Sequence, residues 1–128
     1  MNPDDRPTAE ALPAPRFDTL PLDPKLLQAV ADSGYTAMTP IQAKAIPVVL
    51  AGRDVMGAAQ TGTGKTAAFT LPLLQRMLKH ENPSTSPARH PVRALVLPPT
   101  GELAVQVAGN VGKYAKQTQL RSLVVCGG

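Results

Sequence analysis

The run of residues 59–66 constrains what this chain can fold into more than any other part of the sequence. A phosphate-binding loop has the pattern glycine, four residues, and then Gly-Lys-Ser/Thr, and this run departs from it only at the first position. An ordinary strand-to-helix turn also uses glycine and small residues, but it does not require the Gly-Lys-Thr that is present here. The run therefore predicts a loop that holds the phosphates of a nucleotide, formed by Ala59, Gln60, Thr61, Gly62, Thr63, Gly64, Lys65 and Thr66.

The residue types in this loop fit the chemistry of phosphate binding. Gly62 and Gly64 can adopt backbone conformations closed to other residues, so successive N–H groups can point at phosphate oxygens. Lys65 is expected to place its ammonium against the outer phosphates, and the Thr66 hydroxyl is expected to bind Mg²⁺ at the start of a helix. Ala59 fits the loop if its φ is negative, so we interpret it as a subtype marker. Lys65 and Thr66 are the residues we predict to take part in catalysis.

The sequence on both sides of the loop predicts an α/β fold. Residues 54–58 are expected to form a short strand before the loop, and residues 66–71 a mostly apolar helix after it. Apolar strands are expected at 93–97 and 122–126, separated by a helix at 102–116. Strands that alternate with helices specify a parallel sheet with right-handed crossovers, and a phosphate loop belongs at the carboxyl end of its strand.

Capping signals predict two more helices before the loop. The first is capped by Asp23, begins with a proline and ends before Gly34. The second covers about residues 39–50, with Thr39 as its cap and a proline in its first turn.

Proline and cysteine positions add further expectations. Pro72 should kink or break the helix after the loop, leaving residues 73–80 as a separate amphipathic portion. Residues 1–16 are rich in proline and charge and are expected to be a disordered leader, and residues 81–91 an exposed loop. The lone cysteine, Cys126, is expected to be a buried thiol.

Composition and charge limit the class of protein. The chain has 128 residues, 43% of them hydrophobic, which is enough for one domain. Eleven basic and four acidic residues follow residue 23. This balance favours a polyanionic partner such as nucleic acid, although a solvated basic surface would have the same count. No apolar run approaches the roughly 20 residues that a membrane helix requires, so we expect a cytoplasmic protein with no membrane partner.

A second motif lies ahead of the loop. Phe17 stands 17 residues before the segment 34–42, and this arrangement together with the loop resembles the DEAD-box ATP-dependent RNA helicases, most of all their bacterial members. The resemblance implies that residues 17–128 are the N-terminal portion of a RecA-like helicase domain, an incomplete parallel sheet of about three strands with flanking helices. It also implies that Gln42 recognises adenine through its amide and that Phe17 stacks on the base, so the cofactors would be ATP and Mg²⁺. Met38 departs from the proline usual in this motif.

A third motif suggests contact with RNA. Residues 95–104 resemble the family motif that touches the RNA backbone, and a glycine pair at the end of the chain resembles another. Gly101 replaces the arginine of the family motif, which removes a charged contact and should weaken RNA binding. A simple helix cap would explain the same segment equally well on sequence grounds. The resemblance places the RNA contacts at Pro99, Thr100, Gly127 and Gly128.

The sequence lacks several groups that ATP hydrolysis requires. Hydrolysis needs a carboxylate for Mg²⁺, a residue that orients water and usually an arginine. None of the acids after residue 23 follows an apolar strand as a magnesium-binding carboxylate should, and the family's Asp-Glu-Ala-Asp motif would lie beyond residue 128. The acids after residue 23 are Asp32, Asp54, Glu81 and Glu102. Because these groups are lacking, we expect this chain alone to bind ATP or ADP without hydrolysing it.

Two other functions remain open at this point. The chain could be another P-loop enzyme, such as a small-molecule kinase, or a non-catalytic nucleotide-binding or RNA-interacting module. A sheet of only three strands would also expose an edge and uncovered helix faces, so we expect marginal stability or self-association.

Overall fold

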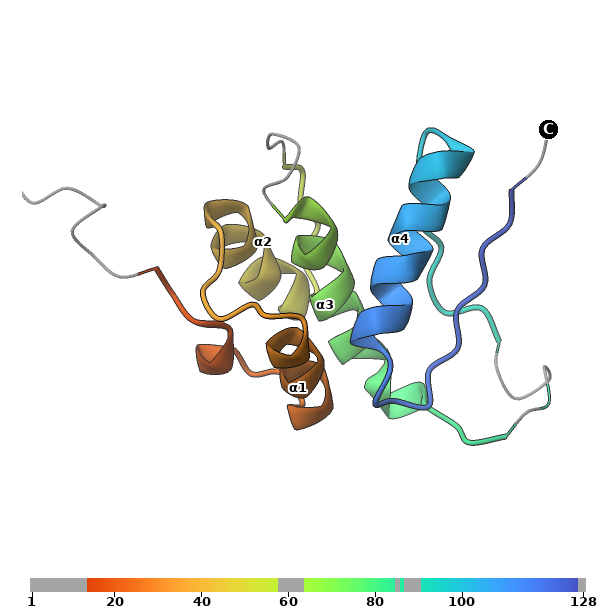
Figure 1. The fold of residues 1–128 in the computed structure, drawn as a ribbon, viewed down its shortest axis with the longest axis horizontal. Coiled ribbons are helices and arrows are strands. Elements are labelled where there is room, and N and C mark those ends of the chain that lie inside the picture. Colours follow the sequence, from red (N-terminus) through yellow and green to blue (C-terminus); the bar gives the residue numbers. More distant parts are fainter. Residues whose placement is uncertain (1–13, 58–63, 85, 87–90, 127–128) are drawn as a thin grey trace, which may run out of the picture.

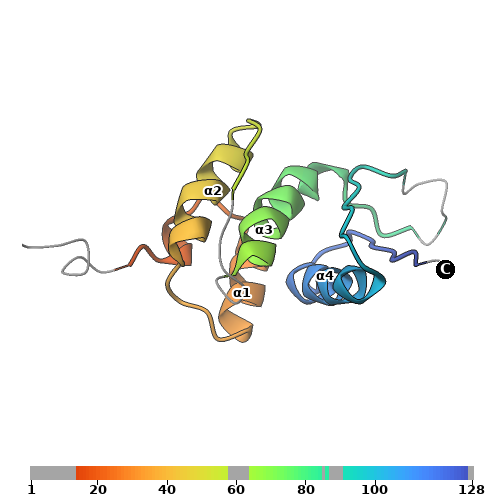
Figure 2. The ribbon, with the colours of Figure 1, turned by 90° about the horizontal axis from the view of Figure 1, so that it is seen from above.

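The fold is described by a computed structural model, which covers residues 14–57, 64–84, 86 and 91–126. These described residues contain four α-helices and two short 3-10 helices (Figure 1). Seen from above, α4 lies on the far side of α3 from α2 (Figure 2). Their bounds are η3 Phe17–Thr19, α1 Pro24–Asp32, α2 Pro40–Leu50, α3 Lys65–Met77, η4 Leu78–His80 and α4 Gly101–Tyr114.

The capping predictions for the first two helices are confirmed. The Asp23 carboxylate accepts a hydrogen bond from the backbone N–H of Lys25 at 2.9 Å, with proline at the first position of α1. Thr39 caps α2 in a reciprocal arrangement with Gln42. Gly34 has a φ of 83°, the left-handed conformation that ends a helix without the steric cost of a Cβ.

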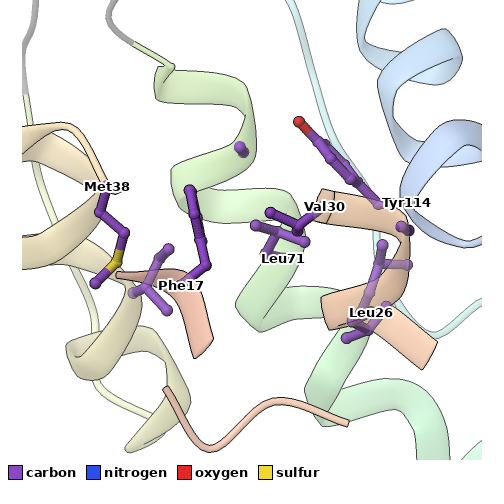
Figure 3. Close-up of a cluster of buried hydrophobic side chains, with 10 residues drawn as sticks. Phe17, Leu26, Val30, Met38, Leu71 and Tyr114 are labelled. Carbon is purple, nitrogen blue, oxygen red and sulfur yellow. The ribbon is translucent and has the colours of Figure 1, made fainter. Parts of the chain in front are cut away.

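A hydrophobic cluster joins α1, α2, α3 and the end of α4. Leu26 and Val30 of α1 pack with Leu71 of α3, and Tyr114 reaches the same cluster from α4 (Figure 3). Phe17 and Met38 extend it toward α2. This cluster positions the amino-terminal end of α3, where the phosphate loop was predicted.

The prediction that Pro72 separates two helical portions is wrong, because α3 continues through it to Met77. Proline lacks the N–H that would bond to the carbonyl of Ala68, so the helix has one hydrogen bond fewer. Leu71 and Leu74 on either side are 0% and 2% exposed. Burying both in the hydrophobic cluster requires the helix to continue, and this packing outweighs the missing bond.

Where the structure describes them, at 54–57, 93–97 and 122–126, the three segments predicted as strands are extended but do not form strands. No ladder pairs residues 93–97 with 122–126, and the backbone bonding between separate segments is a single antiparallel bridge between Arg16 and Ala37. Both extended segments nevertheless run toward the edge where α3 and α4 begin (Figure 1). The Cys126 thiol lies 3.9 Å from the carbonyl oxygen of Gly101 at that edge. The direction expected of a parallel sheet is present without its hydrogen bonds.

Cys126 was predicted to be buried, and this is wrong. Its side chain is exposed because, among the described residues, no strand or helix covers the outer face of the segment that carries it. The same lack of cover leaves Leu123 and Val125 at 89% and 82% exposure.

None of the helices that the structure describes combines the length and apolar character needed to cross a bilayer. The predicted leader lies outside the described residues, apart from its last three positions.

Candidate nucleotide-binding site

The amino-terminal ends of α3 and α4 face the same edge of the molecule (Figure 1). A helix start carries backbone N–H groups without intrahelical partners and a partial positive charge, so this edge can hold anions. Lys65 is the first residue of α3 and its side chain is exposed. Thr66 is half-buried, and its carbonyl accepts a hydrogen bond from the Thr70 hydroxyl at 2.7 Å.

Gly64 is the N-cap of α3 and has a φ of 81°. A Cβ at this position would collide with the side-chain amide nitrogen of Gln42. Glycine is therefore required at this position for two reasons, which are the backbone conformation and the close approach of a neighbouring side chain.

The Gln42 side chain connects the start of α2 with the start of α3. Its Oε1 accepts a hydrogen bond from the backbone N–H of Thr39 at 2.9 Å, and its Nε2 donates to the carbonyl oxygen of Gly64 at 3.2 Å. It is 5% exposed. An amide can form a further hydrogen bond at each end, but the burial of Gln42 leaves its bond to a base edge a prediction, as for Phe17. The structure thus brings together Gln42, Gly64 and Lys65.

Phe17 is 3% exposed and packs in the hydrophobic cluster (Figure 3). The structure offers no open ring face on which adenine could stack, so this role stays a prediction that requires the ring to become accessible. Met38 is buried in the same cluster and supplies apolar contact there.

Pro99 and Thr100 lie at the same edge as Lys65, directly before α4. The Thr100 hydroxyl oxygen accepts a hydrogen bond from the Leu103 N–H at 3.1 Å, so the helix-cap interpretation is confirmed. The remaining predicted site residues lie outside the described residues. They are Ala59, Gln60, Thr61, Gly62, Thr63, Gly127 and Gly128.

The described residues fit a nucleotide phosphate better than they fit a metal alone. Gly64, the free N–H groups of α3 and the exposed Lys65 ammonium suit an anion. For Mg²⁺ they offer only the Thr66 hydroxyl, since no group of three or more His, Cys, Asp or Glu side chains gathers anywhere in the described part of the chain. The metal would therefore have to be held mainly by phosphate oxygens and water.

A family model for the DEAD/DEAH box helicases matches residues 39–128, which include the predicted site residues other than Phe17. The chain belongs to the DEAD/DEAH box helicase family. It is 43% identical over 119 residues to the DEAD-box ATP-dependent RNA helicase RhpA of Helicobacter pylori, covering 93% of this chain and 22% of RhpA. It is 48% identical over 112 residues to the ATP-dependent RNA helicase SrmB of Escherichia coli, covering 88% of this chain and 24% of SrmB.

Solved DEAD-box structures resemble this fold. A DEAD box protein from Methanococcus jannaschii superimposes with a TM-score of 0.67 and 32% identity, over 83% of this chain and 26% of that one. An RNA helicase from Chaetomium thermophilum bound to ADP gives a TM-score of 0.69 and 39% identity, over 84% and 26%. These similarities support the predicted α/β class. The chain spans about a quarter of the length of these DEAD-box relatives, or slightly less.

Sequence reasoning missed the bond between Gln42 and Gly64. The spacing of Thr39 and Gln42 is that of a capping box, and this was the available signal that the glutamine side chain turns back toward the helix start. No local pattern indicated that the same amide reaches a carbonyl 22 residues later.

Proposed function

We propose that this chain is the ATP-binding segment of a DEAD-box RNA helicase, which couples ATP binding and hydrolysis to the unwinding or remodelling of RNA duplexes. The observation that carries the proposal is the hydrogen bond from the Gln42 amide to the Gly64 carbonyl. This bond links the residue proposed to recognise adenine with the loop proposed to hold phosphate. Adenine bound at Gln42 can therefore influence the geometry of the phosphate loop, and phosphate bound in the loop can influence Gln42.

The proposed roles follow from position. Lys65 would bind the outer phosphates, and the N–H groups at the start of α3 would donate hydrogen bonds to the oxygens of the inner ones. Thr66 would contribute one oxygen to Mg²⁺, which when bound supplies charge neutralisation between the phosphates. The loop residues 59–63 would complete the phosphate site. RNA backbone would contact Pro99, Thr100 and the terminal glycine pair, and a cytoplasmic location belongs to the same proposal.

The chain alone is proposed to bind nucleotide without hydrolysing it. Among the described acids, Glu81 already bonds to Lys25 and to the backbone of Gln119, while Glu102 is exposed in the first turn of α4. Within the described residues, no group of three or more His, Cys, Asp or Glu side chains that could hold a metal ion is present. ATPase activity of the purified chain that Lys65→Ala abolishes would contradict this part of the proposal.

Thermal unfolding with Mg²⁺ and ADP, ATP or GDP tests nucleotide binding. A ligand at about 100 times its dissociation constant adds roughly 2.7 kcal/mol to the free energy of unfolding. We expect stabilisation by adenine nucleotides only, lost in Lys65→Ala and strongly reduced in Gln42→Ala. Lys44→Ala is the matched control, because Lys44 is an exposed lysine of the same helix as Gln42. Equal stabilisation by GDP would favour another class of P-loop protein.

A further inference from the structure

Four basic side chains gather at the end of the molecule opposite the proposed nucleotide site. Lys79 and His80 lie in η4, Arg93 begins the extended segment 93–97, and Arg121 directly precedes the segment 122–126. All four side chains are exposed. We call these four residues the basic end. His80, Arg93 and Arg121 line one end of a single cavity between α3, α4 and the extended segments.

Specific contacts hold the basic end together. The backbone N–H of Gln119 donates to the Glu81 carboxylate at 2.9 Å, which brings the chain after α4 beside η4. The Arg121 guanidinium reaches the carbonyl oxygen of Ser84 at 3.5 Å. The clustering of positive charge is therefore a consequence of the fold and not of adjacency in the sequence.

These charges have no acidic partner in the part of the chain that the structure describes. Its two salt bridges join Arg16 to Asp18 and Lys25 to Glu81. Both oxygens of Glu81, the nearest acid in the chain, are already used by Lys25 and Gln119. The pKa of His80 is lowered by partial loss of hydration and then by the charges of Arg93 and Lys79, as expected where like charges meet.

The basic end is remote from the proposed nucleotide site and from the proposed RNA contacts at Pro99 and Thr100. The 13 residues of α3 separate Lys65 from η4, a helix length of about 20 Å. In Figure 1 the starts of α3 and α4 lie at the top, while η4 lies at the bottom. A ligand at the basic end would therefore leave the nucleotide site free.

We propose that the basic end binds the backbone of single-stranded RNA as a second, separate RNA contact. Lysine and arginine attract phosphates, while guanidinium and imidazole planes can also stack on unpaired bases. An acidic peptide would use only the charge. The choice of RNA rests on the proposed function, whereas the presence of an anion-binding surface does not.

The test is RNA binding by the whole 128-residue chain without nucleotide or Mg²⁺. Fluorescence anisotropy of a labelled oligouridine of about 12 nucleotides is measured between about 50 and 200 mM salt. For the triple variant Lys79→Ala, Arg93→Ala, Arg121→Ala, we expect at least about a tenfold loss of affinity. The slope of log affinity against log salt should become shallower by about 2, since each lost phosphate contact on a single strand contributes about 0.7.

The control variant is Lys44→Ala, Arg53→Ala, Lys116→Ala, which removes the same charge from exposed residues elsewhere. It should change affinity less than the first variant and leave the slope nearly unchanged. The proposal is overturned if both variants lose affinity equally, if the native chain binds no RNA, or if polyglutamate competes as well as unlabelled RNA. Circular dichroism verifies folding of each variant. Nucleotide stabilisation should persist in the basic-end variant, so failure of either proposal is recognised separately.

Discussion

At the scale of single residues, Gly64 connects conformation with function. Its left-handed φ and the adjacent Gln42 amide both exclude a side chain. The sequence motif explains why a glycine stands in the loop, but it does not explain the second constraint, which comes from a residue of another helix.

We predict that Gly64→Ala lowers the free energy of unfolding by about 1–2 kcal/mol through the left-handed conformation forced on a residue with a Cβ, and by a further amount through the collision with the Gln42 amide. Gly109→Ala, in the middle of α4 where nothing lies within 4 Å of the added Cβ, should instead stabilise by about 0.5–1 kcal/mol. Urea unfolding measures both. In a Gln42→Ala background the cost at Gly64 should shrink, and an unchanged cost would show that the collision contributes nothing.

At the scale of elements, Glu81 ties the amino-terminal end of α1 to the chain that follows α4. Its carboxylate accepts from the Lys25 ammonium at 2.8 Å and from the Gln119 N–H at 2.9 Å. The Gln119 N–H, and then Lys25, hold the pKa of Glu81 below its usual range. A carboxyl group with a lowered pKa stabilises the fold above its unfolded pKa, and this stabilisation is lost as the pH falls through the folded value.

We predict that Glu81→Gln destabilises the fold by about 1 kcal/mol at neutral pH, because the charge-assisted bonds are partly exposed. The difference from the native chain should shrink as the pH falls below the ordinary glutamate range, and it should vanish only below the lowered folded-state pKa of Glu81, where the native carboxyl is protonated as well. Denaturant titrations at a series of pH values measure this. Asp18→Asn, in the fully exposed pair with Arg16, is the control and should have little effect; a pH-independent loss for Glu81→Gln would refute the electrostatic explanation.

At the scale of the whole molecule, the absence of strand pairing leaves apolar surface uncovered in the described segments. Leu95 and Leu97 are 76% and 81% exposed. On the neighbouring segment, Leu123 and Val125 are 89% and 82% exposed. Extended backbone without partners beside apolar side chains favours pairing with another chain.

We predict that the purified chain associates with itself in a concentration-dependent manner. Replacing Leu95, Leu97 and Val125 with serine should reduce association without loss of helical circular dichroism, because these side chains lie outside the hydrophobic cluster. Sedimentation velocity over a concentration series measures the mass. The matched control Met56→Ser removes an exposed apolar side chain from a different segment. A native chain that stays monomeric at all concentrations would refute the prediction.

Local chemistry in the sequence determined the helices, their caps and the family. Asp23, Thr39 and Thr100 act on backbone groups only two or three residues away, so their effect can be read from spacing alone. The phosphate-loop pattern is likewise local, and the family match confirms the family resemblance that it helped to suggest, while its role in nucleotide binding stays a prediction.

Tertiary structure decided what depends on distant partners. The continuation of α3 through Pro72 depends on burial against other helices, and the exposure of Cys126 depends on a missing neighbour. The strands were predicted from apolar runs, but a strand forms only when another segment supplies hydrogen bonds, and the described residues supply none. The Gln42–Gly64 bond and the basic end arise in the same way, because packing brings together residues that no sequence spacing relates.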